Sequence, residues 1–234
     1  MPKHLQREMD GIKKKILSLS ALVEENVQKA VWAISQRNSD AAREVIKSDT
    51  IVDQMEIDIE EDCLKILALH QPVAIDLRFI VAVLKINNDL ERIGDIAVNI
   101  ARRAVYLSLQ ERVDIPVDLA GLAGKARAML RQSLDSLVGM DPELARDVCA
   151  ADDEVDEMNR QLQKQVEEQI RALPERVDYL TQLLRVSRHL ERIADHATNI
   201  AEDVIYMTVG EIVRHRVEEH LPHAEKPREA GTDR

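Results

Sequence analysis

The chain has 234 residues, of which 45% are hydrophobic but only 2% aromatic, and its formal net charge is −11. So few aromatic residues, with only seven glycines and seven prolines, disfavour a β-sandwich or barrel and indicate long helices packed through aliphatic side chains. The negative charge argues against nucleic acid as a main partner, because phosphate groups repel an acidic surface.

Three amphipathic helices are predicted in the first half of the chain. Hydrophobic residues at three- and four-residue steps indicate a first helix over residues 4–36. The cap-type residues Asn38-Ser39-Asp40 then introduce a second helix, which runs to about residue 69. His70-Gln71-Pro72 interrupts the pattern, and a third helix is expected to continue to about residue 110.

The second half repeats this plan after Asp114-Ile115-Pro116. A shorter fourth helix over residues 117–137 is expected to end at Gly139 in a left-handed conformation. Asp141-Pro142 is a strong start signal for a fifth helix, which should run to about residue 172. Leu173-Pro174 separates it from a sixth helix that ends near residue 209.

An internal repeat explains why the two halves have the same plan. Leu90-Glu91-Arg92-Ile93 recurs as Leu190-Glu191-Arg192-Ile193, and Asp, Ala, Asn, Ile and Ala then follow in register. Short turns between long helices favour antiparallel neighbours. We therefore expect an all-α protein of two tandem three-helix bundles, over residues 1–112 and 113–212. Residues 213–234 are rich in charged residues and are expected to form a disordered tail.

Each half also carries a pair of acidic motifs, Asp-x-x-x-Asp in the second helix and Glu-x-x-x-Asp in the third. The first half contributes Asp49, Asp53, Glu91 and Asp95, and the second half contributes Asp152, Asp156, Glu191 and Asp195. Folding each helix pair back about Pro72 or Pro174 brings the two motifs of that half to one height. Four carboxylates at one height suit a hard cation that prefers oxygen ligands.

The position of these acids around the helix predicts an open site. At 100° per residue, Glu91 and Asp95 lie nearly opposite the hydrophobic stripe and should face solvent. A metal site would then lie on the bundle surface. The alternative is that the acids are ordinary solvent-facing charges, and the sequence leaves both interpretations open.

Other residues with metal or catalytic chemistry give weaker signals. Ferritin-like di-iron chemistry needs inward-facing Glu-x-x-His pairs, and these helices have none. His189 and His196 flank the second motif and are interpreted as surface or packing residues. Cys63 and Cys149 have no metal-type spacing and are expected to be reduced thiols. Without a catalytic motif, secretory signal or membrane-length apolar run, we expect a cytosolic protein that is not an enzyme.

The duplicated acidic motifs resemble the PhoU family of bacterial phosphate regulators over residues 1–210. The resemblance implies that the eight motif carboxylates bind iron, zinc, manganese or magnesium ions on the bundle surface. It also implies a cytoplasmic homodimer that links the ATPase subunit of the phosphate ABC transporter to a sensor histidine kinase. Such a protein would repress phosphate-starvation genes, restrain uptake and meet the membrane only through its partners.

Two other classes stay open at this stage. The chain could be a metal-binding or metal-storage protein whose clusters are its function, or a helical module with only a structural role. Metal binding without partner binding would favour the first class, and the absence of both would favour the second.

Overall fold

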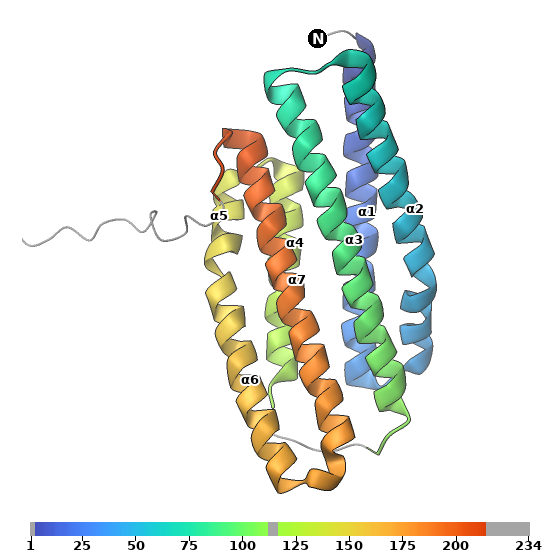
Figure 1. The fold of residues 1–234 in the computed structure, drawn as a ribbon, viewed down its shortest axis with the longest axis vertical. Coiled ribbons are helices and arrows are strands. Elements are labelled where there is room, and N and C mark those ends of the chain that lie inside the picture. The colour runs from blue at the N-terminus through green and yellow to red at the C-terminus, as the bar shows by residue number, and fades with distance from the viewer. Residues whose placement is uncertain (1–2, 112–116, 214–234) are drawn as a thin grey trace, which may run out of the picture.

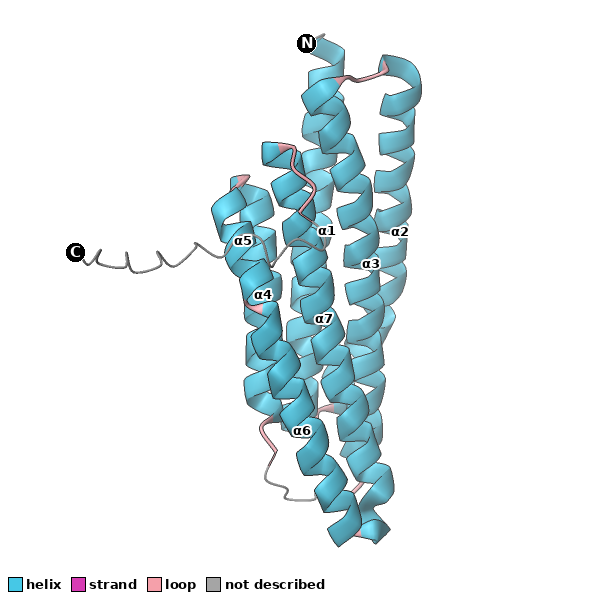
Figure 2. Cartoon of the chain, turned by 60° about the vertical axis from the view of Figure 1, so that its left-hand side comes forward, coloured by secondary structure: helices cyan, strands magenta, loops and turns pink. Residues whose placement is uncertain are grey.

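The computed structural model describes residues 3–111 and 117–213, and their regular structure is entirely helical (Figures 1 and 2). The elements are α1 (Lys3–Gln36), α2 (Ser39–His70), α3 (Ala74–Ser108), α4 (Leu119–Gly139), α5 (Pro142–Ala150), α6 (Asp152–Ala172), the 3₁₀ turn η1 (Pro174–Arg176) and α7 (Val177–Val209). The predicted all-α class is confirmed. Most of the predicted tail, residues 214–234, lies outside the described residues.

The fifth predicted helix is divided in two, so the expectation of one continuous helix to residue 172 is wrong. The chain departs from the helix at Ala151, whose N–H donates to the carbonyl of Val148 at 3.1 Å. This bond to the third preceding residue tightens the last turn of α5. A new helix then begins at Asp152, which places that carboxylate at a helix N-terminus.

The predicted helix starts are confirmed at two caps. The Asn38 side chain accepts the N–H groups of Asp40 and Ala41, and the Asp141 side chain accepts those of Glu143 and Leu144. These four bonds satisfy N–H groups that have no partner within the helix. The end of α4 differs from the prediction, because Met140 takes the left-handed conformation at φ 52° while Gly139 stays helical.

Two three-helix bundles lie side by side, with α3 and α7 packed against each other between them (Figure 1). The first bundle contains α1, α2 and α3, and the second contains α4, the α5–α6 pair and α7. Near one end of α3, Lys85 contacts Asp203, and near the other end Arg103 contacts Gln182. The residue numbers run in opposite directions, so the two central helices are antiparallel.

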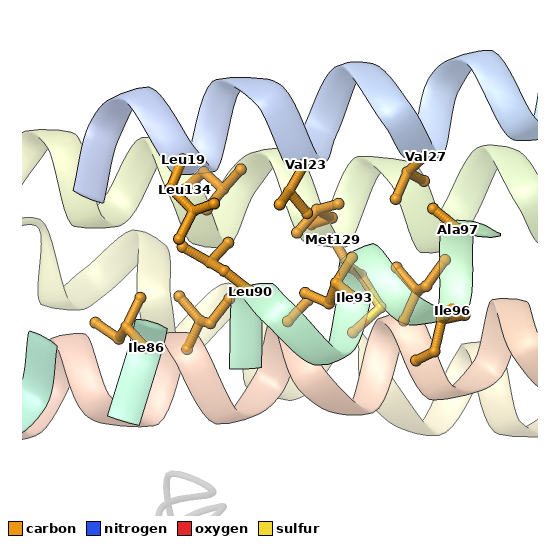
Figure 3. Packing of buried hydrophobic residues seen from close by; sticks show 14 of the residues in the cluster. Leu19, Val23, Val27, Ile86, Leu90, Ile93, Ile96, Ala97, Met129 and Leu134 are labelled. Atoms are coloured by element: carbon orange, nitrogen blue, oxygen red, sulfur yellow. The ribbon is translucent and has the colours of Figure 1, made fainter. Parts of the chain in front are cut away.

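Aliphatic side chains fill the space between the helices, as the low aromatic content predicts (Figure 3). The stripe that holds the repeated motif is buried in both copies. Its buried members are Leu90, Ile93, Ala97 and Ile100 on α3, and Leu190, Ile193, Ala197 and Ile200 on α7. Burying this stripe fixes the rotation of each central helix, and therefore fixes where the acids between the apolar positions can point.

Candidate metal centres

The second acidic cluster brings three predicted carboxylates together between α6 and α7. One oxygen from each of Asp156, Glu191 and Asp195 lies within 4.8 Å of the others. Three carboxylate oxygens gathered this closely could share one metal ion. Within the described residues, this is the one set of three acidic, histidine or cysteine side chains gathered so closely.

Asp152, the fourth predicted residue, lies beside this group at the start of α6. Its carboxylate accepts a hydrogen bond from the Thr198 hydroxyl at 3.2 Å. Burial raises the pKa of Asp152, and the charges of Asp156 and Asp153 raise it further, against the opposing effect of Thr198. The positive end of the helix dipole favours an anion at this position. Thr198 was missed by sequence reasoning, because its counterpart in the first motif is Val98.

The carboxylates of the second cluster raise one another's pKa through charge repulsion. Burial raises the pKa of Glu191, and the neighbouring charges of Asp195, Asp156 and Asp152 add to the effect. The pKa of Asp195 is raised by burial and then by Asp152 and Asp156. Each carboxylate therefore makes ionisation of the next less favourable. A bound cation would reverse this effect.

The carboxylates of the first cluster are less closely gathered than those of the second. Burial raises the pKa of Asp49, followed by the charges of Asp53 and Asp95, so its carboxylates also act on one another. Burial and then Asp95 raise the pKa of Glu91, although Arg92 opposes the shift. Arg92 places its Nε 3.5 Å from a Glu91 oxygen. Three oxygens of this cluster do not come within 4.8 Å of one another in the described residues.

Close packing of α2 on α3 positions the first cluster. A methyl group built on Gly94 would lie 3.0 Å from Cγ1 of Val52, so the two helices are in near contact there. The equivalent residue on α7 is Ala194, which already carries that methyl group. The flanking helix also shields part of the acidic face: the Glu91 side chain is 25% exposed and that of Asp95 is 48% exposed. The acids therefore face solvent as predicted, but the neighbouring helix covers part of them.

Glu56 is a further acid near the first cluster that sequence reasoning missed. It lies one turn beyond Asp53 on α2, and its charge contributes to the raised pKa of Glu91. Burial raises the pKa of Glu56 itself, and the charges of Glu60 and Asp53 raise it further. The signal that could have found it is the i+3 spacing from Asp53, which places both on one helix face.

His189 and His196 lie on α7, at the junction of the bundles. Nδ1 of His196 lies 2.8 Å from Oδ1 of Asp89, and the Asn199 amide donates to the same oxygen at 3.3 Å. His196 is therefore a packing residue, paired across α3 and α7, as the sequence interpretation allowed. His189 is half-buried two turns earlier on α7. The two cysteines are free thiols on different helices, α2 and α5.

The donor set fits a hard metal ion. All of the predicted ligands are carboxylates, and oxygen donors favour magnesium, manganese, calcium or oxidised iron over softer ions. Asp156, Glu191 and Asp195 would hold an ion in the second cluster, with Asp152 close by. Metal binding by the eight predicted residues stays a prediction.

The chain is similar to known proteins over most of its length. The PhoU domain matches twice, over residues 16–104 and 119–204, so one copy falls on each bundle. The chain belongs to the PhoU family. A PhoU homologue from Aquifex aeolicus, named a phosphate-specific transport system accessory protein, is 39% identical over 212 residues, covering 91% of this chain and 96% of the relative. A homologue of the same name from Pseudomonas aeruginosa is 36% identical, covering 89% and 86%.

Solved PhoU structures share the fold. The crystal structure of PhoU from Pseudomonas aeruginosa superposes with a TM-score of 0.85 at 35% identity, over 88% of this chain and 99% of the other. The phosphate transport system regulatory protein PhoU from Streptococcus pneumoniae superposes with a TM-score of 0.80 at 28% identity, covering 89% and 99%. The predicted pair of tandem bundles is thus confirmed. No helix in the described part of the chain is long and apolar enough to cross a membrane.

Proposed function

We propose that this PhoU-family chain is a negative regulator of phosphate uptake and signalling. It would act in the cytoplasm as a homodimeric adaptor between the ATPase subunit of a phosphate ABC transporter and a sensor histidine kinase. The observation that supports this most directly is the relatives' name, phosphate-specific transport system accessory protein, over about nine-tenths of the chain.

The surface of the first bundle supports an adaptor role. At the turn between α2 and α3, large aliphatic side chains are exposed instead of buried: Leu69 is 65% exposed, Val73 73% and Ile75 67%. Exposed apolar groups gathered at one tip are typical of protein contact surfaces. The corresponding turn of the second bundle, at η1, contains the charged residues Glu175 and Arg176. The two bundle ends would therefore meet different partners.

The proposed role of the metal is to neutralise the acidic clusters. In the second cluster the carboxylates repel one another, as their raised pKa values indicate. A cation bound there would stabilise the packing of α6 on α7. This would make the surface presented to a partner depend on metal.

Deletion of the gene tests the regulatory proposal. We expect the deletion strain to produce alkaline phosphatase in high phosphate, and we expect the wild-type gene to restore repression. A deletion strain that still represses the enzyme would contradict the proposal. The control variant Arg131→Gln removes an exposed arginine on α4 that is paired with Asp135, and it should restore repression as fully as the wild type does.

The alternative is a metal-binding or metal-storage protein without a signalling role, and the Asp156, Glu191 and Asp195 group favours it. The triple variant Asp156→Asn, Glu191→Gln, Asp195→Asn separates the regulatory function from the storage function. Its metal content is measured on the purified protein, and its ability to repress is measured in the deletion strain. If the variant loses metal and also fails to repress, metal serves regulation. If deletion leaves repression intact while the wild-type protein binds metal, the storage function is supported.

A further inference from the structure

A cavity of about 420 Å³ lies where the two bundles meet, between the C-terminal parts of α1 and α3 and the N-terminal parts of α4 and α7. Its walls are mainly large aliphatic side chains, among them Ile34, Ile100, Leu107, Leu183, Val186 and Leu190. Sites for small molecules have volumes of about 300–1,000 Å³ and walls of this kind. The cavity is therefore large enough for a ligand, and its walls favour one with an apolar body.

The unequal lengths of α1 and α4 explain why this space is left open. The PhoU-domain match begins at residue 16 in the first bundle and at residue 119 in the second, so residues 3–15 of α1 have no counterpart in α4. This additional part of α1 contacts Phe79, which is 6% exposed and has the Lys13 ammonium 5.3 Å from its ring centroid. Tyr179 takes the place of Phe79 on α7, where it is half-buried and lines the cavity. The cavity follows from the shorter α4, which has no equivalent of these turns.

The wall that α4 contributes is made of small residues. Ala120, Ala123 and Gly124 all line the cavity. A methyl group built on Gly124 would meet no atom within 4 Å, so there is free space next to this part of the helix. Larger side chains at these positions would occupy space that is now open.

The charged groups that line the cavity are arginines, and none of its described lining residues is acidic. Arg37 donates to the backbone carbonyls of Ser108, at 3.4 Å, and of Gln110. Arg127 is half-buried on α4 and forms no hydrogen bond or ion pair with the residues that the structure describes. An arginine without a carboxylate partner at the edge of an apolar cavity suits a ligand with an anionic head, because its planar array of N–H donors matches a carboxylate.

We propose that this cavity binds a fatty-acid-like molecule, with one hydrocarbon chain among the aliphatic side chains and its carboxylate at Arg127. The apolar walls would remove the chain from water, and the guanidinium group would gain an anionic acceptor. Both bundles contribute walls, so the ligand would contact both. The site goes beyond the regulatory function proposed above, and it uses none of the predicted metal ligands.

The size of the cavity favours a small molecule over a protein segment. One turn of an α-helix, about 10 Å wide and about 5.4 Å long, already occupies a volume of this order. A partner helix or a second copy of the chain therefore could not place more than a single turn there. A flexible hydrocarbon chain has no such restriction.

Equilibrium dialysis of the full chain with radiolabelled decanoate, below its micelle-forming concentration, tests the proposal. We expect saturable binding of one decanoate per chain. Gly124→Leu should weaken binding at least about tenfold, because the leucine side chain would fill part of the cavity. Its melting temperature without decanoate should equal or exceed that of the wild type, since leucine favours helix more than glycine does. Loss of binding would then not be loss of fold.

A second variant tests the contact with the carboxylate. Arg127→Gln should weaken decanoate binding at least about tenfold, because it removes a charge-assisted hydrogen bond. The uncharged competitor 1-decanol should displace decanoate equally well from the wild type and from this variant, at matched occupancy. Arg131→Gln, one turn further along α4, removes an exposed arginine paired with Asp135 and should bind decanoate normally. Asp156→Asn should also bind normally, which separates the cavity from the metal centres.

Four outcomes would overturn the proposal. The first is a wild-type protein without saturable binding of decanoate. The second is equal affinity in the wild type and Gly124→Leu, which would place the ligand outside the cavity. The third is an equal effect of Arg127→Gln and Arg131→Gln, which would reduce the contact to general charge. The fourth is binding to phosphatidylglycerol vesicles without binding of free decanoate, which would indicate a membrane surface instead. None of these outcomes depends on whether deletion of the gene relieves repression.

Discussion

Asp89 shows how a single residue can join the two bundles. It is 8% exposed, and its carboxylate is held by the His196 ring and the Asn199 amide from the opposite bundle. Buried carboxylates are stable only when they keep such partners. The pair therefore helps fix the relative position of α3 and α7.

Replacing His196 by leucine should destabilise the protein by about 1–3 kcal/mol, because Asp89 then keeps only one partner in a buried position. Urea unfolding followed by circular dichroism measures the change. The control is Arg160→Gln, which removes an exposed arginine paired with Glu157 on the same helix. That pair is worth about 0.5 kcal/mol or less, and an equal loss in both variants would contradict the assigned role of Asp89.

Cys63 is expected to resist alkylation. Burial is the main cause that raises its pKa, from 9.0 to about 12, with smaller effects from Asp62 and Glu60. At pH 8 the native thiol would then hold roughly a thousandth of the thiolate present in the unfolded chain. Iodoacetamide labelling followed by mass spectrometry, in native buffer and in urea, checks this. Labelling of Cys63 at similar rates in both states would contradict it.

At the scale of elements, residues at the helix ends determine where several helices begin or end. Asn38, Asp118 and Asp141 cap three helices through their side chains, and Gly210 ends α7 at φ 84°. The left-handed conformation is costly for residues with a Cβ atom, so glycine is favoured there. The break at Ala151 shows that a helix can also end without any such signal.

Two glycine-to-alanine substitutions should have opposite effects. Gly210→Ala should destabilise by about 1 kcal/mol through backbone strain, and its methyl group would also contact the Arg78 guanidinium. Gly11→Ala places a methyl group in open space within α1, and should stabilise by about 0.5–1 kcal/mol because alanine favours helix. Thermal unfolding of both variants compares them. A stabilising Gly210→Ala would show that α7 ends without this strain.

At the scale of the whole molecule, duplication gives two acidic clusters that are similar in sequence but unequal in geometry. The second gathers three carboxylates, while in the first Arg92 lies 3.5 Å from Glu91 and 3.9 Å from Asp95. An intramolecular cation of this kind competes with a metal ion for the same charges. We therefore expect the second cluster to bind metal more tightly than the first.

Neutralising one acid in each cluster tests the role of these charges. The double variant Asp95→Asn, Asp195→Asn should leave the metal-free protein as stable as the wild type or slightly more stable, by about 0.2–0.5 kcal/mol for each like-charge pair removed. It should also lose metal, because an amide is a poorer ligand for a hard cation. Metal analysis and thermal unfolding, with and without chelator, measure both effects. Unchanged metal content would show that the acids are ordinary surface charges.

The sequence by itself determined the all-helical class and the two bundles, and it predicted that the acidic motifs of each half lie at one height. These follow from periodicity, from cap residues such as Asn38 and from the repeat of the Leu-Glu-Arg-Ile motif, all of which act over short distances along the chain. The height at which Asp156 meets Glu191 could be predicted from the position of Pro174, because antiparallel helices fold back about their turn.

Only the tertiary structure decided how closely these groups meet. The distance between carboxylates depends on the packing of α6 on α7 and on the break at Ala151, and no local pattern encodes either. The contact between Asp89 and His196 joins residues 107 positions apart. The physical reason is that burial and pairing depend on neighbours from the other bundle, which the chain supplies only once it has folded.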